Sequence, residues 1–299
     1  MRAGLLVLAL SIALAVAGLA AVQKAADHQA QTLIARVLPY AGLGYQRLWA
    51  WPWGSATAWN LSLQPSALTR TLLGLPEDSR LFVREAWLRG VDTGPDGELR
   101  ALRLSLYGLS APPRRGPVRG LGPARAFSAA ELGLRQLRGE AHLQLQPSGA
   151  DQPPMLTLQL RLEALGEADL QLRLEADESV LRGRWDRAVL HEASLRWLDQ
   201  GLAPALRAAL ARRAGIPEST WQQRLRSPQG WPDGLLGPAL ALAPGQSLGL
   251  RLAPLRPLPL DELRLYAPAQ RADRLGLGTD APPARPWPAP RPLPGWALP

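Results

Sequence analysis

Leucine recurs at every second position in several separate stretches of this chain, and polar residues fill most of the positions between them. A period of two is the period of a β-strand, whose successive side chains point to opposite faces. The pattern therefore predicts antiparallel strands with one leucine-rich face and one polar face. The alternating residues are Trp59, Leu61 and Leu63; Leu102, Leu104 and Leu106; Leu143 and Leu145; Leu156, Leu158, Leu160 and Leu162; Leu170, Leu172 and Leu174; and Leu248, Leu250 and Leu252.

Turn-forming residues separate these stretches. Gly94-Pro95-Asp96-Gly97 precedes the second, Pro147-Ser148-Gly149 precedes the fourth, and Gly166 follows the fourth. Glycine, proline and aspartate favour tight turns, so we predict a hairpin from residues 155–164 and 168–176. A further strand is predicted from Val189 to Trp197. One side of that strand would carry Val189, His191, Ala193, Leu195 and Trp197.

Residues 202–214 have helical spacing instead. Asp199 can cap the helix start, Pro204 suits the first turn, and Gly215 favours the end. A second short helix is predicted at about residues 217–225. The two helices would form a hairpin that covers an open edge or face of the sheet.

The N-terminal residues form an uncharged run from Ala3 to Val22, between Arg2 and Lys24. As a helix, about twenty residues reach roughly 30 Å, the thickness of a bilayer's hydrocarbon core. We therefore predict a single-pass membrane anchor over residues 1–24, followed by a juxtamembrane helix over residues 25–38. A cleaved secretory signal is the alternative. The anchor positions include Ala3, Leu5, Leu10, Leu14 and Val22.

Composition excludes several classes of protein. Hydrophobic residues make up 46% of the 299 residues, which excludes a disordered chain, and the absence of cysteine excludes disulfides and thiolate metal sites. The net charge of +9 comes almost entirely from arginine. Together with abundant alanine, leucine, glycine and proline, this reflects a GC-rich coding sequence. No basic stretch is interleaved with aromatic residues, so we expect no nucleic-acid partner.

Catalytic and cofactor motifs are not found in the sequence. The three histidines, His28, His142 and His191, include no pair with metal-ligand spacing. His142 is expected on a solvated polar face. His191 is the one histidine to inspect for catalysis, although a half-buried structural histidine is the simpler interpretation. We expect no catalytic residue, no cofactor and no metal.

Acidic residues gather around the predicted hairpin, where they alternate with Arg161 and Arg173. This arrangement is typical of a solvated face with cross-strand charge pairs. The alternative is a hydrolase with two paired carboxylates, drawn from Glu163, Glu175 and Asp186. The acidic residues of the cluster are Glu163, Glu167, Asp169, Glu175, Asp177 and Glu178.

Tryptophans gather in two places. Trp49, Trp51 and Trp53 would point the same way from an extended segment, as a core wedge or an interfacial belt. Leu48 and Trp59 suggest that this segment continues into the sheet, which favours the core wedge. Trp287 and Trp296 lie in the tail 281–299, whose eight prolines predict polyproline or disordered structure. Membrane-surface or partner binding is the alternative for this tail.

The order of these segments carries a family resemblance. Gly44-Tyr45-Gln46-Arg47-Leu48 leads to Pro52-Trp53-Gly54-Ser55-Ala56 and then to the Leu-x-Leu strands, and Asp199-Gln200-Gly201-Leu202 enters the helix. The layout resembles bacterial envelope proteins of the AsmA-like and YdgA-like groups. That resemblance implies membrane-anchored, noncatalytic work in the periplasm, tied to lipid transport or outer-membrane homeostasis. The proline-rich tail and the shorter chain argue against a lipid conduit.

The sequence as a whole predicts an α+β, mainly β protein. An N-terminal transmembrane helix is followed by an extended, bent antiparallel sheet over residues 39–280, with a covering helical hairpin near residues 202–225 and a disordered tail over residues 281–299. We expect a noncatalytic inner-membrane protein, most of it in the periplasm, that binds lipid or an envelope protein partner through its apolar sheet face.

Overall fold

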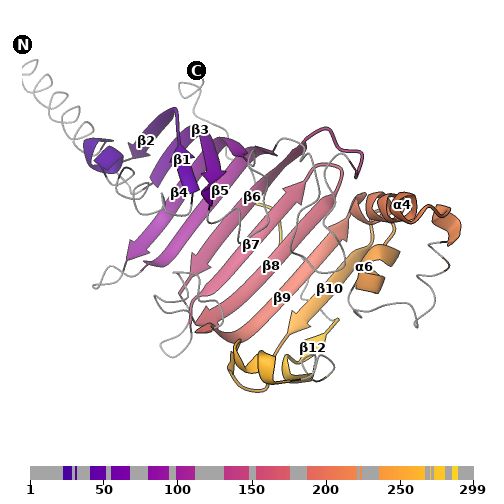
Figure 1. The fold of residues 1–299 in the computed structure, drawn as a ribbon. Helices are drawn as coiled ribbons and strands as arrows, with labels where there is room; N and C mark the ends of the chain where they lie inside the picture. The colour runs from indigo at the N-terminus through magenta and orange to yellow at the C-terminus, as the bar shows by residue number, and fades with distance from the viewer. Residues whose placement is uncertain are drawn as a thin grey trace, which may run out of the picture.

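Figure 1 shows the computed structural model of the chain. It describes residues 23–28, 31, 41–51, 55–67, 80–93, 99–111, 131–147, 153–175, 187–220, 223, 236–266, 270, 273–279 and 285–288. The predicted anchor positions, residues 3–22, lie outside this set. Residues 23–28 and 31 are helical, within the predicted anchor end and juxtamembrane segment. Among the described residues, no helix is both long enough and apolar enough to cross a membrane.

One large antiparallel sheet dominates the described residues, and this confirms the mainly β prediction. Between β3 and β9 each strand pairs with the next one along the chain, so the sheet is largely a meander. The strands are β1 (Ala41–Gly44), β2 (Arg47–Trp51), β3 (Ser55–Pro65), β4 (Leu81–Thr93), β5 (Leu99–Ala111), β6 (Leu137–Gln146), β7 (Met155–Leu162), β8 (Gly166–Glu175), β9 (Val189–Asp199), β10 (Ser247–Leu252), β11 (Leu258–Pro259) and β12 (Leu277–Gly278). β1 and β2 both pair with β3, β10 lies between β9 and β12, and β11 pairs with β9.

The strand register aligns the predicted leucines. One cross-strand row from β5 to β10 consists entirely of leucine: Leu104, Leu143, Leu158, Leu170, Leu195 and Leu250. Paired residues in a sheet point to the same face, so these side chains share one face. A one-residue slip of any strand would move its leucines to the opposite face, which explains why the register is so regular. We call this side of the sheet the leucine face.

Two bulges keep apolar residues on the leucine face where strict alternation would not. In β5 the register shifts between Leu106 and Leu109, and Gly108 adopts a positive φ of 62°. In β9, Glu192 pairs with Arg173 of β8 and Leu190 pairs with Leu174. The extra residue of this bulge is therefore His191. The prediction that Val189 and His191 share a side with Ala193, Leu195 and Trp197 is therefore wrong. Leu190, only 4% exposed, takes that side instead.

Two helices, α4 (Leu202–Ala214) and α6 (Leu236–Ala241), pack mainly against each other. Figure 1 places them beside β10 at one end of the sheet. The predicted range of the first helix is confirmed, and residues 218–220 and 223 are also helical. A short 3-10 helix, η3 (Glu262–Leu265), follows β11.

Asp199 stabilises the start of α4. Its fully buried carboxylate accepts hydrogen bonds from the amides of Gly201 and Ala203 at 3.1 and 2.9 Å, and from the Trp197 indole at 3.2 Å. The capping role predicted for Asp199 is confirmed, although Gly201 occupies the N-cap position itself. Gly215 ends the helix in the left-handed conformation, as predicted.

Candidate functional site

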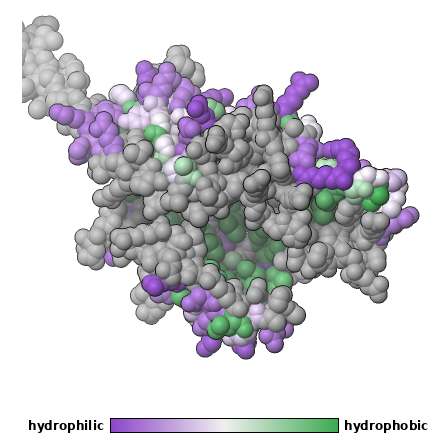
Figure 2. Space-filling view, in the orientation of Figure 1, coloured by the Kyte–Doolittle hydropathy of each residue, from purple (hydrophilic) through white to green (hydrophobic). Residues whose placement is uncertain are grey.

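The leucine face has a dense core at one end. Val83, Ala86, Leu109 and Ala141 are buried there, and leucines of β3, β4, β5 and β7 pack against them. Further along, the leucines of β7 and β8 are only partly buried. Figure 2, in the orientation of Figure 1, shows a hollow over the central strands with a largely apolar floor. A sheet face that is half-buried in its middle is suited to contact with an apolar molecule.

The opposite face carries the polar residues and a chain of aromatic rings. Trp87 of β4 packs edge-to-face on Tyr107 of β5, with ring centroids 5.7 Å apart, and Tyr107 packs on His142 of β6 at 5.4 Å. Cross-strand pairing aligns these positions: Trp87 lies opposite Ser105, and Ser105 lies opposite His142. Edge-to-face contacts of this kind add about 0.5–1.5 kcal/mol each beyond area burial.

Four residues of the C-terminal tail, 285–288, lie on this polar face, and we call them the strap. Arg285 forms an ion pair with Asp169 of β8, whose carboxylate also accepts the Arg285 amide at 3.2 Å. The Gln159 side chain of β7 donates to the Arg285 carbonyl at 3.3 Å. Trp287 contacts the His142 ring, with centroids 4.9 Å apart, and the Arg161 guanidinium lies 4.3 Å from the Trp287 centroid. These four residues of the predicted polyproline or disordered tail are held against the sheet.

The strap is held because the sheet offers it matched partners. Proline carries no backbone N–H, so the Arg-Pro-Trp-Pro segment is held by the Arg285 amide and carbonyl and by side chains. Asp169 supplies the charge for Arg285, and Arg161 and His142 supply the surfaces for Trp287. Sequence alternation alone placed these partners on the polar face, but nothing local indicated that a segment more than a hundred residues away would bind them.

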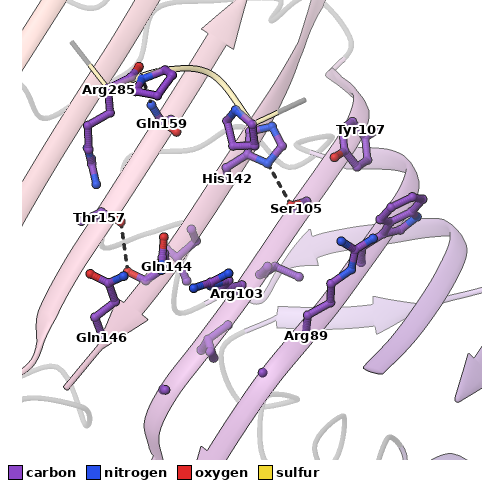
Figure 3. A pocket seen from close by; sticks show the side chains of 18 of the residues that line it. Arg89, Arg103, Ser105, Tyr107, His142, Gln144, Gln146, Thr157, Gln159 and Arg285 are labelled. Carbon is purple, nitrogen blue, oxygen red and sulfur yellow. Dashed lines mark hydrogen bonds between the residues drawn. The ribbon is translucent and has the colours of Figure 1, made fainter. Parts of the chain in front are cut away.

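A cavity of about 850 Å³ lies between the strap and strands β4 to β7. Figure 3 shows the polar side chains that line it. None of the described lining residues is acidic, whereas three are arginines: Arg89, Arg103 and Arg285. The uncharged polar lining residues are Ser105, Tyr107, His142, Gln144, Gln146, Thr157 and Gln159. Sequence reasoning assigned this face to solvent and missed the cavity.

His142 is buried, not solvated as predicted, with only 6% of its surface exposed. Its Nδ1 atom lies 2.9 Å from the Ser105 hydroxyl, and its buried Nε2 atom has no hydrogen-bond partner among the described residues. Burial lowers the pKa of the His142 imidazole below its ordinary value, opposed by Glu140 and reinforced by Arg161. The imidazole is therefore neutral at pH 7.

Trp49 of the predicted tryptophan wedge is not in the core. Trp49 pairs with Thr57, which places it on the polar face, and it is 38% exposed. Trp51 packs against Trp49 with ring centroids 6.0 Å apart. The core-wedge prediction is wrong for Trp49, because the leucines fill the other face and leave the polar side to the tryptophans. Trp53 and Trp296 lie outside the described residues.

The predicted charge pairs are partly confirmed. Arg161 and Glu167, directly opposite on β7 and β8, form an ion pair at 2.7 Å. Of the hydrolase candidates, Glu163 lies in the turn between these strands, and Glu175 lies at the far end of β8, 3.4 Å from His191. The structure does not bring those two carboxylates together. Asp186 lies outside the described residues, as do Asp177 and Glu178.

Within the described ranges, no group of three or more histidine and acidic residues is arranged to hold a metal ion. Comparison with known proteins adds no assignment, since no family model, curated protein or solved structure matches this chain. The candidate sites are therefore the leucine face and the cavity under the strap, and each must be interpreted from its own chemistry.

Proposed function

We propose that this protein is a noncatalytic envelope protein, anchored in the inner membrane with its sheet in the periplasm, that binds lipid acyl chains on its leucine face. The observation that carries the proposal is the row of six leucines running without interruption from β5 to β10. The rows on either side are also mostly apolar. One contains Leu106, Ala141, Leu160, Ala168, Trp197 and Leu248; the other contains Leu102, Leu145, Leu156, Leu172, Ala193 and Leu252.

The packing of this face supports a ligand. A stable sheet ordinarily buries its apolar face under a second layer of secondary structure. Among the described elements, α4 and α6 pack mainly against each other, and the leucines of β7 and β8 stay half-buried. Each methylene of an acyl chain that such a surface removes from water contributes about 0.8 kcal/mol, so a chain of ordinary length would bind firmly.

The location is proposed from the sequence. The uncharged run from Ala3 to Val22 has the length of a membrane span, and the resemblance to envelope proteins implies the periplasm. A reporter enzyme that is active only outside the cytoplasm, fused after Pro299, tests this orientation. We expect this reporter to be active. If it is inactive, and a second reporter that works only in the cytoplasm is active at the same position, the proposed orientation is reversed.

Neighbouring residues of β8 offer a matched test of the leucine face. Leu172 lies on the leucine face and Gln171 on the polar face, and because the chain has no cysteine, each can carry a unique thiol. L172C and Q171C would be labelled with a benzophenone maleimide and irradiated with radiolabelled oleate. We expect crosslinking of oleate from position 172 and little from position 171.

The outcomes of this experiment separate lipid from protein. Equal crosslinking at the two positions would contradict a face-specific lipid site. In cells, a crosslink from position 172 to another protein, without lipid, would instead identify the leucine face as a protein interface. Circular dichroism of both labelled variants checks that the sheet is intact.

A further inference from the structure

The cavity beneath the strap has the electrostatics of an anion site. It lies on the polar face of the sheet, so it is separate from the proposed lipid surface. Its described lining contains arginines and no acidic residue, and Arg285 is already paired with Asp169. Arg89 is engaged by other residues as well, so the charge that an incoming ligand would meet is that of Arg103.

These two arginines lie directly opposite each other on β4 and β5. The Arg89 guanidinium stacks on the Trp87 ring at 4.3 Å, which fixes its position. Arg103 is exposed and makes no hydrogen bond or ion pair within the described part of the chain. In Figure 3 its side chain extends from β5 toward β6.

Uncharged hydrogen-bonding groups continue the same row. Arg103 pairs with Gln144 of β6, and Gln144 pairs with Thr157 of β7. Amide and hydroxyl groups both donate and accept, which matches the hydroxyls of a sugar. A cavity of about 850 Å³ is far larger than an isolated phosphate requires and lies within the usual range for small-molecule sites.

We propose that this cavity binds an anionic saccharide. Arg103 holds its phosphate or carboxylate group in charge-assisted hydrogen bonds, and Gln144 and Gln146 bind its hydroxyls. Pro286 and Pro288 of the strap form the opposite wall. The saccharide is either free or the headgroup of a glycolipid, since both present the same chemistry.

Calorimetric titration of the purified full-length protein in mild detergent tests the proposal. Glucose 1-phosphate is the soluble probe, glucose is the uncharged control, and vesicles of phosphatidylcholine with glucuronosyl diacylglycerol present the lipid-linked form. Arg103→Gln removes the unpaired charge. Arg251→Gln is the matched control, because Arg251 lies on the same face, outside the cavity, and pairs with Glu192.

We expect at least one charged probe to bind and glucose to bind far more weakly. Arg103→Gln should raise the Kd of that probe about tenfold or more, whereas Arg251→Gln should leave it unchanged. Binding of glucose 1-phosphate assigns a free saccharide, and binding of the glycolipid vesicles alone assigns a lipid headgroup. Failure of both probes, or equal losses in the two variants, would overturn the proposal.

Discussion

Removing the Trp287 side chain tests how the strap is held. Trp287 makes an edge-to-face contact with His142 at 4.9 Å and lies 4.3 Å from the Arg161 guanidinium. The first contact is worth about 0.5–1.5 kcal/mol and the second about 0.5–1 kcal/mol at a partly exposed site. Trp287→Ala should therefore lower the free energy of unfolding by about 1–2.5 kcal/mol. With an m-value of about 3 kcal/mol/M, the urea midpoint would fall by roughly 0.3–0.8 M.

The same substitution should change the titration of His142. Burial is the main cause of its lowered pKa, and Trp287 covers the ring. NMR titration should show the His142 pKa rising toward its ordinary value in Trp287→Ala. Trp49→Ala is the matched control, because Trp49 is on the same face and contacts Trp51. An unchanged His142 pKa together with an unchanged urea midpoint in Trp287→Ala would refute the strap contact.

Three further predictions follow from single contacts. Gly166→Ala should cost about 1–3 kcal/mol in urea unfolding, since Gly166 has a φ of 148° and an added Cβ would lie 2.3 Å from the Leu198 carbonyl oxygen. Asp169→Asn should weaken the hold on Arg285, and we expect amide hydrogen exchange at Arg285 to accelerate about tenfold or more. Between the ordinary His pKa of about 6.5 and the lower folded value, the unfolded chain binds more protons at His142. Stability should therefore decrease as the pH is lowered through this window, and it is complete above it. His142→Gln should flatten that part of the urea-midpoint profile, and an identical slope in both proteins would count against a depressed pKa.

The leucine pattern predicted much of the sheet because alternation is a direct consequence of strand geometry. Leu156 to Leu162 and Leu170 to Leu174 indicated both the β7–β8 hairpin and its buried side. Helix α4 was equally predictable from the sequence, since Asp199 and Gly215 act through local backbone contacts. These elements depend on residues close together in sequence.

Features that depend on contacts between distant residues could not be predicted from the sequence in this way. The bulge at His191 moves Leu190 onto the leucine face, and only the pairing with β8 shows it. His142 is buried because Trp287, far along the chain, covers it. Trp49 was assigned to the core because its segment was expected to continue into the sheet, although its pairing with Thr57 places it on the polar face. The cavity combines four strands with the strap, so no local motif could mark it.

Native mass spectrometry of the full-length protein, purified in mild detergent without delipidation, tests the central claim most directly. A leucine face that binds acyl chains predicts a population carrying the mass of one or more lipids, which added oleate displaces. Leu158 lies in the middle of the all-leucine row, so Leu158→Gln should reduce this population, whereas Gln171→Asn on the opposite face should not. A protein free of lipid that also takes up no oleate would contradict the claim.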